Sequence, residues 1–320
     1  MRKLFVGVCA SLALTGISNA QNWPDKPVTV VVPFPAGGST DTIARTVATY
    51  LQKKFDKPFV VENKAGATGT IGATQVKRAA PDGYTIMVTS LGPLVIAPHL
   101  IKNTPYDPLT DFDTITVLVQ APNVLVVPAS SPHKSVADIL AYERANPGKM
   151  TFASSGNGAS DHLTAELFWQ QTKTSGTHVP YKGGAPAITD LLGGQVDASW
   201  QNINAIIGHV KSGKLKALAI TGAKRSPLLP NVPTLDEAGV PNVDVYSWQA
   251  MVAPKGLPPA VRTNLHAATV EALNDPQVKP KLDEVGFEVV GNSPEAFAAF
   301  EKTEFARWKS VIEKGKITAD

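Results

Sequence analysis

The stretch that decides the fold is Val28-Thr-Val-Val-Val-Pro-Phe-Pro-Ala-Gly-Gly-Ser-Thr-Asp41. Its β-branched residues predict a strand over 28–32, and a helical pattern follows over 40–53. A helix start leaves backbone N–H groups unpaired and carries partial positive charge. Gly37 and Gly38 place no side chain in front of those N–H groups. The stretch therefore predicts a socket for a carboxylate, phosphate or sulfate, although an ordinary strand-to-helix turn has the same composition.

The rest of the chain alternates strands with helices in the same way. The predicted strands are apolar on both faces, which is typical of parallel sheets covered by helices on each side. Further strands are predicted at 59–62, 84–89, 124–127, 151–153, 178–181, 196–200 and 215–221, and helices at 69–79, 135–144, 160–171, 186–192, 204–211, 258–273 and 294–313.

Two long extended stretches predict crossings between two lobes. One covers 113–128 and is broken by Ala121-Pro122-Asn123; the other covers 243–254. We therefore expect an α/β protein of two lobes, each a mainly parallel sheet flanked by helices, with hinges near residues 121–123 and Val245–Trp248. The expected lobes are residues 21–122 with 246–320, and residues 123–245.

The N-terminus has the pattern of a cleavable secretory signal. Arg2 and Lys3 precede the uncharged apolar residues 4–17, and Ser18-Asn19-Ala20 matches the small-x-small rule for cleavage before Gln21. A membrane anchor is the alternative, but the apolar run is shorter than the ~20 residues needed to span a bilayer. We therefore expect export to the periplasm, with residues 1–20 removed.

A lipoprotein is a second alternative, because the chain's single cysteine, Cys9, lies in this segment. The large Val8 before it fits lipoprotein processing poorly, and its removal with the signal excludes disulfide and thiolate chemistry. Cleavage also leaves 28 basic residues against 27 acidic ones. This balance, without a basic run, argues against binding to nucleic acid.

A second Gly/Ser loop repeats the pattern of the first. Met150-Thr-Phe-Ala-Ser-Ser-Gly-Asn-Gly-Ala-Ser160 again places a strand before Ser and Gly residues and a helix. Ligands of open α/β sheets bind at the carboxyl ends of strands, so two facing loops of this kind would grip an anion. The loops at 66–69 and 181–185 have similar compositions. Ordinary helix capping is the alternative for each loop taken alone.

Enzyme motifs are incomplete or missing. Gly208–Leu215 has phosphate-loop spacing, but Leu215 replaces the Ser or Thr that holds magnesium. The sequence has no Gly-x-Ser-x-Gly motif, and its six histidines show no metal-binding spacing. His162 begins a helix beside the second loop, and we expect it to lie at the surface or behind the site rather than to act as a catalyst. Asp41 and Asp161 are expected to cap or complement helix starts. We expect no catalysis, no metal and no cofactor.

A series of motifs over nearly the whole exported chain resembles the Bug-type periplasmic solute receptors of tripartite tricarboxylate transport systems. The motifs are Pro27-Val28, Val32-Pro-Phe-Pro-Ala-Gly-Gly-Ser-Thr-Asp41, Val61-Glu-Asn-Lys-Ala-Gly-Ala67, Pro81-Asp-Gly-Tyr84, Ser155-Gly-Asn-Gly158, Val179-Pro-Tyr-Lys-Gly-Gly184, Leu192-Gly-Gly-Gln-Val-Asp197 and Pro254-Lys-Gly-Leu-Pro258. The resemblance implies a Venus-flytrap receptor whose loops 34–40 and 154–160 clamp a carboxylate, partly through ordered water. It also implies membrane permease subunits as partners, and we expect a monomer.

One position departs from the family pattern. Gln201 follows Trp200 where many members have an acidic residue that would suit an ammonium group. We therefore expect a mono- or dicarboxylate, aromatic ones included, rather than an amino acid. Trp200 and Trp248 are candidates for an apolar wall, with core packing as the alternative. The expected ligand-binding residues are Phe34, Ala36, Gly37, Gly38, Ser39, Thr40, Ser90, Ser154, Ser155, Gly156, Asn157, Ser160, Tyr181, Trp200 and Asn202.

The expected function is therefore delivery of a small organic carboxylate to a permease. Two other functions remain open on the sequence. A sensory binding protein would use the same cleft to present its ligand to a signalling partner. A secreted enzyme acting on a small acid, with His162 and Asp161 near the cleft, is favoured less because nucleophile, metal and cofactor motifs are missing.

Overall fold

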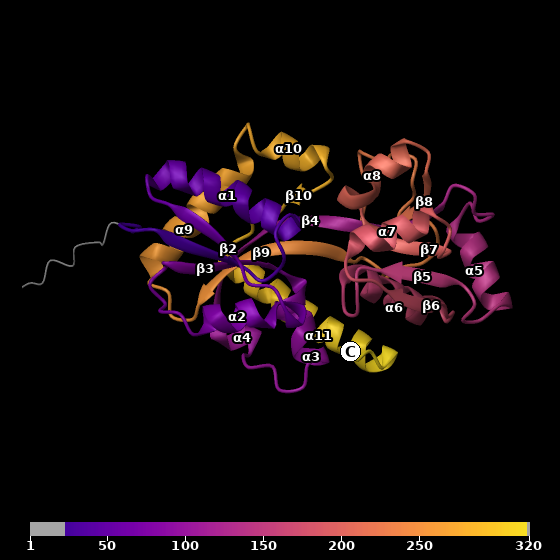
Figure 1. Ribbon diagram of the computed structural model, residues 1–320, viewed down its shortest axis with the longest axis horizontal. Helices are drawn as coiled ribbons and strands as arrows, with labels where there is room; N and C mark the ends of the chain where they lie inside the picture. The colour runs from indigo at the N-terminus through magenta and orange to yellow at the C-terminus, as the bar shows by residue number, and fades with distance from the viewer. Residues whose placement is uncertain (1–22, 319–320) are drawn as a thin grey trace, which may run out of the picture.

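The computed structural model describes residues 23–318. The predicted signal segment, its cleavage site and Cys9 lie outside these residues. Figure 1 shows two lobes side by side, with the strands β4 (Phe112–Pro128) and β9 (Tyr246–Pro254) running between them. No helix within 23–318 is long and apolar enough to cross a membrane.

The first lobe is built on a sheet with the strand order β2-β1-β3-β9-β4. The strand β1 (Val28–Val32) pairs in parallel with β2 (Phe59–Asn63) and β3 (Thr85–Ser90). Alternate side chains of β1 point to opposite faces. Val30 packs with the core under helices α1 (Ser39–Phe55) and α9 (Pro259–Asn274). Val31 packs with the core under α2 (Thr70–Lys77) and α11 (Pro294–Gly315). Both faces of the sheet are therefore buried, as the continuous valine run predicts.

The second lobe is built on the strand order β4-β7-β5-β6. The strand β5 (Thr151–Ser154) pairs in parallel with β6 (Thr177–Pro180) and β7 (Ala198–Asn202), whereas β8 (Leu215–Ile220) pairs antiparallel with β4. Helices α7 and α8 contribute to one core and α5 and α6 to the other, so this sheet is also covered on both faces.

The helices follow the predicted pattern, with additional short elements between them. The long helices are α1 (Ser39–Phe55), α2 (Thr70–Lys77), α5 (Val136–Ala145), α6 (Ser160–Thr172), α7 (Gly184–Leu192), α8 (Ile203–Lys211), α9 (Pro259–Asn274) and α11 (Pro294–Gly315). The short elements are a 3-10 turn (Ala67–Gly69), a π-helical turn (Gly92–Ile96), α3 (Ala97–Leu100), α4 (Pro108–Asp111), α10 (Lys279–Glu284) and the strand β10 (Glu288–Val289).

The two-lobed α/β fold expected from the sequence is confirmed. Each lobe contains three parallel strands, and every antiparallel pair within residues 23–318 includes β4 or β9, the two strands that cross between the lobes. Pro122 pairs with Tyr246 of β9, whereas the next residue, Asn123, pairs with Asn202 of β7. This change of partner supports our proposal that the lobes divide at 122/123 and 245/246.

The C-terminal helix α11 packs against both lobes. In the first lobe its Phe297 ring contacts Trp248 of β9. In the second lobe the side-chain amide of Gln170 on α6 donates to the backbone oxygen of Val311. Figure 1 shows α11 running from beneath the first lobe toward α6 of the second. The lobes are therefore linked by a helix as well as by two crossing segments.

Candidate ligand-binding cleft

A cleft of about 710 Å³ lies between the lobes. The loops after β1 and β3 line it from the first lobe, and the loops after β5 and β6 line it from the second. Of the residues expected at the site, the lining contains Phe34, Ala36, Gly37, Gly38, Ser39, Thr40, Ser90, Ser155, Gly156, Asn157, Ser160 and Asn202. The structure therefore brings both Gly/Ser loops to one cavity, and binding of a ligand by these residues stays a prediction.

The first loop is held in place by the buried carboxylate of Asp41. Its Oδ2 accepts from the Gly37 backbone N–H at 2.9 Å and from Nε of Arg45 at 3.0 Å. The Asn63 amide donates to Oδ1 of Asp41 and to the Phe34 backbone oxygen. Burial alone would raise the pKa of Asp41, but these hydrogen bonds and the Arg45 charge lower it to about 2. Asp41 therefore stays ionised and shapes the loop.

The second loop is held by Asp161, which is 4% exposed. Its Oδ2 accepts from the backbone N–H and the hydroxyl of Ser155, at 2.7 and 2.6 Å, and from the Gln201 amide at 3.2 Å. Burial raises the pKa of Asp161, and the Ser155 hydrogen bonds oppose this shift. Gly156 has φ +136°, a conformation that a side chain would strain. The loop therefore depends on a buried carboxylate and on glycine.

The helices that begin at the cleft have no side-chain cap. The N-cap residues of α1, α6 and α7 are Gly38, Ala159 and Gly183, and none makes a side-chain capping bond. Away from the cleft, Ser135 caps α5 and Ser293 caps α11, whereas α2, α9 and α10 also lack a side-chain cap. Uncapped N-terminal N–H groups and the positive ends of three helix dipoles favour an anion.

The cleft lining carries a positive charge and no acidic side chain among the described residues. Lys182, exposed in the loop after β6, is the charged residue in the lining. An anion would therefore enter the cleft without facing a carboxylate, and the walls offer no ion-pair partner to an ammonium group. The Lys182 position lies in a motif visible in the sequence, but its place at the cleft depends on the position of β6.

Two further polar residues reach the cleft from the crossing strand β9. Ser247 and Gln249 line the cavity, and Gln249 is 2% exposed. Its Oε1 has no hydrogen-bond partner among the described residues. A buried polar atom without a partner costs free energy unless a ligand or water satisfies it. Gln249 is therefore a candidate ligand contact. No local sequence pattern distinguishes Gln249, because the sequence of β9 predicts an extended strand and does not indicate which of its side chains faces the cleft.

Three expected site residues lie outside the cleft lining. Trp200 is fully buried, with its ring 5.5 Å from that of Phe168, because it sits within β7 beneath α6. Ser154 is buried below the second loop. The Tyr181 hydroxyl donates to Asp190 on α7, away from the cavity. None of the three lines this cavity, so their contact with a ligand stays a prediction, and Trp200 has the core packing that the sequence left open as its alternative.

Trp248 is also a core residue rather than a cleft wall. Its side chain is fully buried, with Phe297 and Phe300 of α11 around the ring. Gln201 is likewise buried, and its amide donates to Asp161 and to Ser199. Gln201 therefore lies behind the second loop and supports the carboxylate that holds it.

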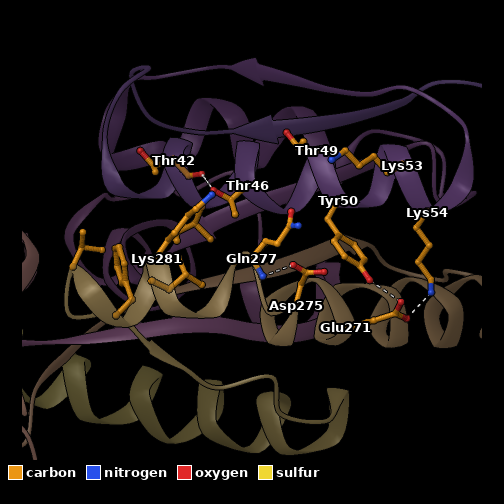
Figure 2. Close-up of a pocket in the computed structure, with 15 residues that line it drawn as sticks. Thr42, Thr46, Thr49, Tyr50, Lys53, Lys54, Glu271, Asp275, Gln277 and Lys281 are labelled. Carbon is orange, nitrogen blue, oxygen red and sulfur yellow. Dashed lines mark hydrogen bonds and ion pairs between the residues drawn. The ribbon is translucent and has the colours of Figure 1, made fainter.

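A second cavity, of about 690 Å³, lies on the first lobe between α1, α9 and α10 (Figure 2). Its acidic residues are already engaged. The Tyr50 hydroxyl and the Lys54 ammonium group both bond to Glu271, which raises the pKa of Tyr50 to about 12. Asp275 accepts from the Gln277 backbone N–H. This cavity lacks converging helix starts, so the anion-binding features are those of the inter-lobe cleft.

The fold and the cleft define a two-lobed periplasmic binding protein. Residues 43–317 match the family described as "Tripartite tricarboxylate transporter family receptor". Protein BugT of Bordetella pertussis is 36% identical over 316 residues, which cover 98% of this chain and 97% of BugT. The chain therefore belongs to the receptor family of tripartite tricarboxylate transporters, a family of solute-binding receptors and not of enzymes.

Solved structures of similar proteins agree with this family assignment. An R. palustris protein solved with adipate is 37% identical, with a TM-score of 0.83, and the match covers 92% of this chain and 99% of that one. MatC from Rhodopseudomonas palustris, solved with bound malate, is 34% identical, with a TM-score of 0.80, and the match covers 91% and 100% of the two chains. Both similar proteins hold dicarboxylates.

Proposed function

We propose that this protein is a monomeric periplasmic receptor that binds a small organic carboxylate and delivers it to a tripartite tricarboxylate-type membrane permease. The observation that carries the proposal is the convergence of three uncapped helix starts on a cleft without acidic side chains. The bound adipate and malate of the similar structures support a carboxylate ligand. The family assignment supports a permease as the receiving partner.

In the proposed complex, loops 34–40 and 154–160 hold one carboxylate group from opposite sides. The first backbone N–H groups of α1 and α6 and the hydroxyls of Ser39 and Thr40 supply the donors, as hydrogen bonds to a charged group are the strong ones. Ser155 lines the same side but donates its hydroxyl to Asp161, so its role is to fix the loop.

The remainder of the ligand extends along the rest of the cleft. Ser90 and Asn202 line this part, together with Gln249. Lys182 is placed to attract a second carboxylate, so we propose a dicarboxylate in preference to a monocarboxylate. The cleft lining offers no carboxylate for an ammonium group, so we propose that amino acids bind weakly.

Thermal unfolding with a panel of carboxylates tests the proposed ligand class. Ligand that binds the native state at 100 times its Kd stabilises it by about 2.7 kcal/mol, so adipate, malate or a related acid is expected to raise Tm. The matched control is the dimethyl ester of the same acid, which retains the carbon skeleton and removes the charge. Equal stabilisation by acid and ester would contradict an anion site.

Delivery to the permease needs a separate measurement in cells. Deleting the receptor gene should abolish uptake of the radiolabelled acid that stabilises the protein, and a plasmid copy should restore it. Normal uptake without the receptor, combined with loss of a transcriptional response to the acid, would indicate a sensory role instead.

A further inference from the structure

The cavity of Figure 2 is a second space of ligand size, and it lies wholly within the first lobe. It has a volume of about 690 Å³ between α1, α9 and α10. Small-molecule sites in proteins are clefts of about 300–1,000 Å³, with mostly apolar walls and a few polar groups that orient the ligand. None of its lining residues also lines the inter-lobe cleft, so the two cavities are separate.

Part of the cavity wall is apolar. Ile43 of α1, Leu282 of α10 and Phe287 beyond α10 line it, and each is at most 5% exposed. Val285 lines it as well and is 41% exposed, so a large apolar side chain of this wall faces water. An apolar group of a ligand would remove that surface from water, which is favourable. The wall therefore suits an aliphatic chain.

The hydroxyl groups of the cavity have no proton left for an anionic ligand. Three of them donate to backbone oxygens four residues earlier, at 2.8–3.1 Å, namely those of Thr42, Thr46 and Thr49. The Tyr50 hydroxyl donates to Glu271, which also accepts from the Lys54 ammonium group. An anionic group in this cavity would therefore take its donors from the remaining nitrogen groups.

Two lysines of the lining provide positive charge. Lys53 on α1 and Lys281 on α10 line the cavity, and neither ammonium group has an ion-pair or hydrogen-bond partner within residues 23–318. Figure 2 shows Lys281 extending from α10 toward α1. Of the two acidic residues in the lining, Glu271 is already paired with Lys54 at 2.5 Å. Three lysines against two carboxylates favour an anion over a cation.

We propose that this cavity binds an amphiphilic monocarboxylate, which lays an aliphatic chain on the apolar wall and places its carboxylate on Lys281. The proposal goes beyond the receptor function and does not depend on it. The two sites differ in chemistry. The inter-lobe cleft presents helix starts to a small polar acid, whereas this cavity derives its affinity from apolar burial and its preference for an anion from a lysine.

The test uses octanoate and its uncharged analogue 1-octanol, which have the same chain. Intermolecular nuclear Overhauser effects from the chain protons to the methyl groups of Ile43 and Leu282 locate the site directly. We expect these contacts for octanoate, with a Kd below about 1 mM. Octanoate is itself a carboxylate and can enter the inter-lobe cleft. Contacts confined to that cleft, or no binding at all, would overturn the proposal.

Substitutions on α10 and beside it separate the two parts of the proposed site. Lys281→Gln should lower octanoate affinity for this cavity roughly threefold, the effect of one exposed ion pair, and leave octanol affinity unchanged. Val285→Ser should weaken both probes, because it removes apolar contact. Lys279→Gln is the matched control, since Lys279 lies on the same helix outside the cavity lining and pairs with Asp283. It should bind octanoate as the wild type does.

The preference for the acid over the alcohol decides the ligand class. Octanol that binds this cavity as tightly as octanoate, or Lys281→Gln that binds octanoate as tightly as the wild type, would overturn the assignment of a carboxylate to Lys281. Binding of adipate or malate in the inter-lobe cleft tests the proposed receptor function separately. Either result can therefore fail without the other.

Discussion

At the scale of single residues, the cleft is shaped by buried carboxylates that do not touch its cavity. Asp41 and Asp161 each accept hydrogen bonds from the backbone of the loop in front of them. Neither Asp41 nor Asp161 is among the residues that line the cavity. Each carboxylate therefore fixes the shape of a loop without facing a ligand in the cleft. The same residue type at the cavity surface would repel an anionic ligand.

Gly156 provides the sharpest test of the second loop. A Cβ at this position would lie 3.3 Å from the Tyr181 backbone oxygen, and φ is +136°. Gly156→Leu should therefore distort the loop and lower carboxylate affinity by roughly ten- to a hundredfold, the loss of one hydrogen bond to a charged group. Gly194→Leu, also at positive φ but with open space around it, is the matched control for strain. Unchanged affinity in a folded Gly156→Leu protein would exclude this loop from the site.

Glu301 in α11 predicts a pH dependence of stability. Burial raises its pKa to about 8, and its Oε1 has no hydrogen-bond partner among the described residues. The folded protein binds a proton here that the unfolded chain releases above its ordinary pKa, so stability falls as pH rises from ~4.5 to ~8. Glu301→Gln should remove this loss and raise stability at pH 8 by about 2 kcal/mol or more, with little change at pH 4.5. Urea unfolding of both proteins at the two pH values measures the difference, and equal pH slopes would contradict it.

At the scale of elements, three helices that begin at the cleft have open first turns, a feature they share with α2, α9 and α10 but not with α5 and α11. The starts of α1, α6 and α7 lack side-chain caps, while α5 and α11 have serine caps. A capping side chain stabilises a helix by about 1 kcal/mol. The cleft helices forgo that stabilisation, which keeps their first N–H groups open to a ligand.

Ala159→Asp tests this trade between stability and binding. Ala159 has the extended conformation of an N-cap residue, so Asp there should cap α6 and raise stability by about 0.5–1 kcal/mol. The same carboxylate would occupy the anion site and abolish carboxylate binding. Ser135→Ala, which uncaps α5 away from the cleft, should do the reverse by lowering stability and leaving affinity unchanged. Retained affinity in Ala159→Asp would show that the ligand does not use this helix start.

Elements of the fold were predictable from sequence where their signal is local. The strand, loop and helix units around Gly37 and Gly156 have clear apolar periods and turn residues. The π-helical turn and α3, in the apolar run over 92–100, were missed because that run shows no period and contains two prolines. The place of Gln249 at the cleft depends on how β9 pairs with β3 and β4, which no local pattern reveals. The sequence left the role of Trp200 open, because an aromatic residue suits a cleft wall or a core equally well; its burial in the structure favours the core.

At the scale of the whole molecule, we propose a hinge where β4 changes its partner. Residues up to Pro122 pair with β9, and residues from Asn123 pair with β7 and β8. A short segment thus belongs to both sheets and can absorb a rotation between them. Gly158 of the second lobe packs against Ile96 and Leu100 of the first, so the lobes already touch beside the cleft.

Small-angle scattering tests lobe closure. A carboxylate that stabilises the protein should reduce its radius of gyration, because rotation about the crossings near 121–123 and 245–248 brings the lobes together. Ala159→Asp with the same acid is the control and should show no change. An unchanged radius at a saturating concentration of bound acid would mean that the protein binds without closing.

The helix α11 has a further consequence for how such a protein can evolve. Its N-terminal part belongs to the packing of the first lobe and its C-terminal part to that of the second, through Gln170 and the apolar residues beside it. Neither lobe can therefore be inherited, exchanged or duplicated as an independent module, because separating the lobes would remove from one of them the part of α11 that packs against it. New specificities in this architecture must arise by changes within the loops, with both lobes kept together.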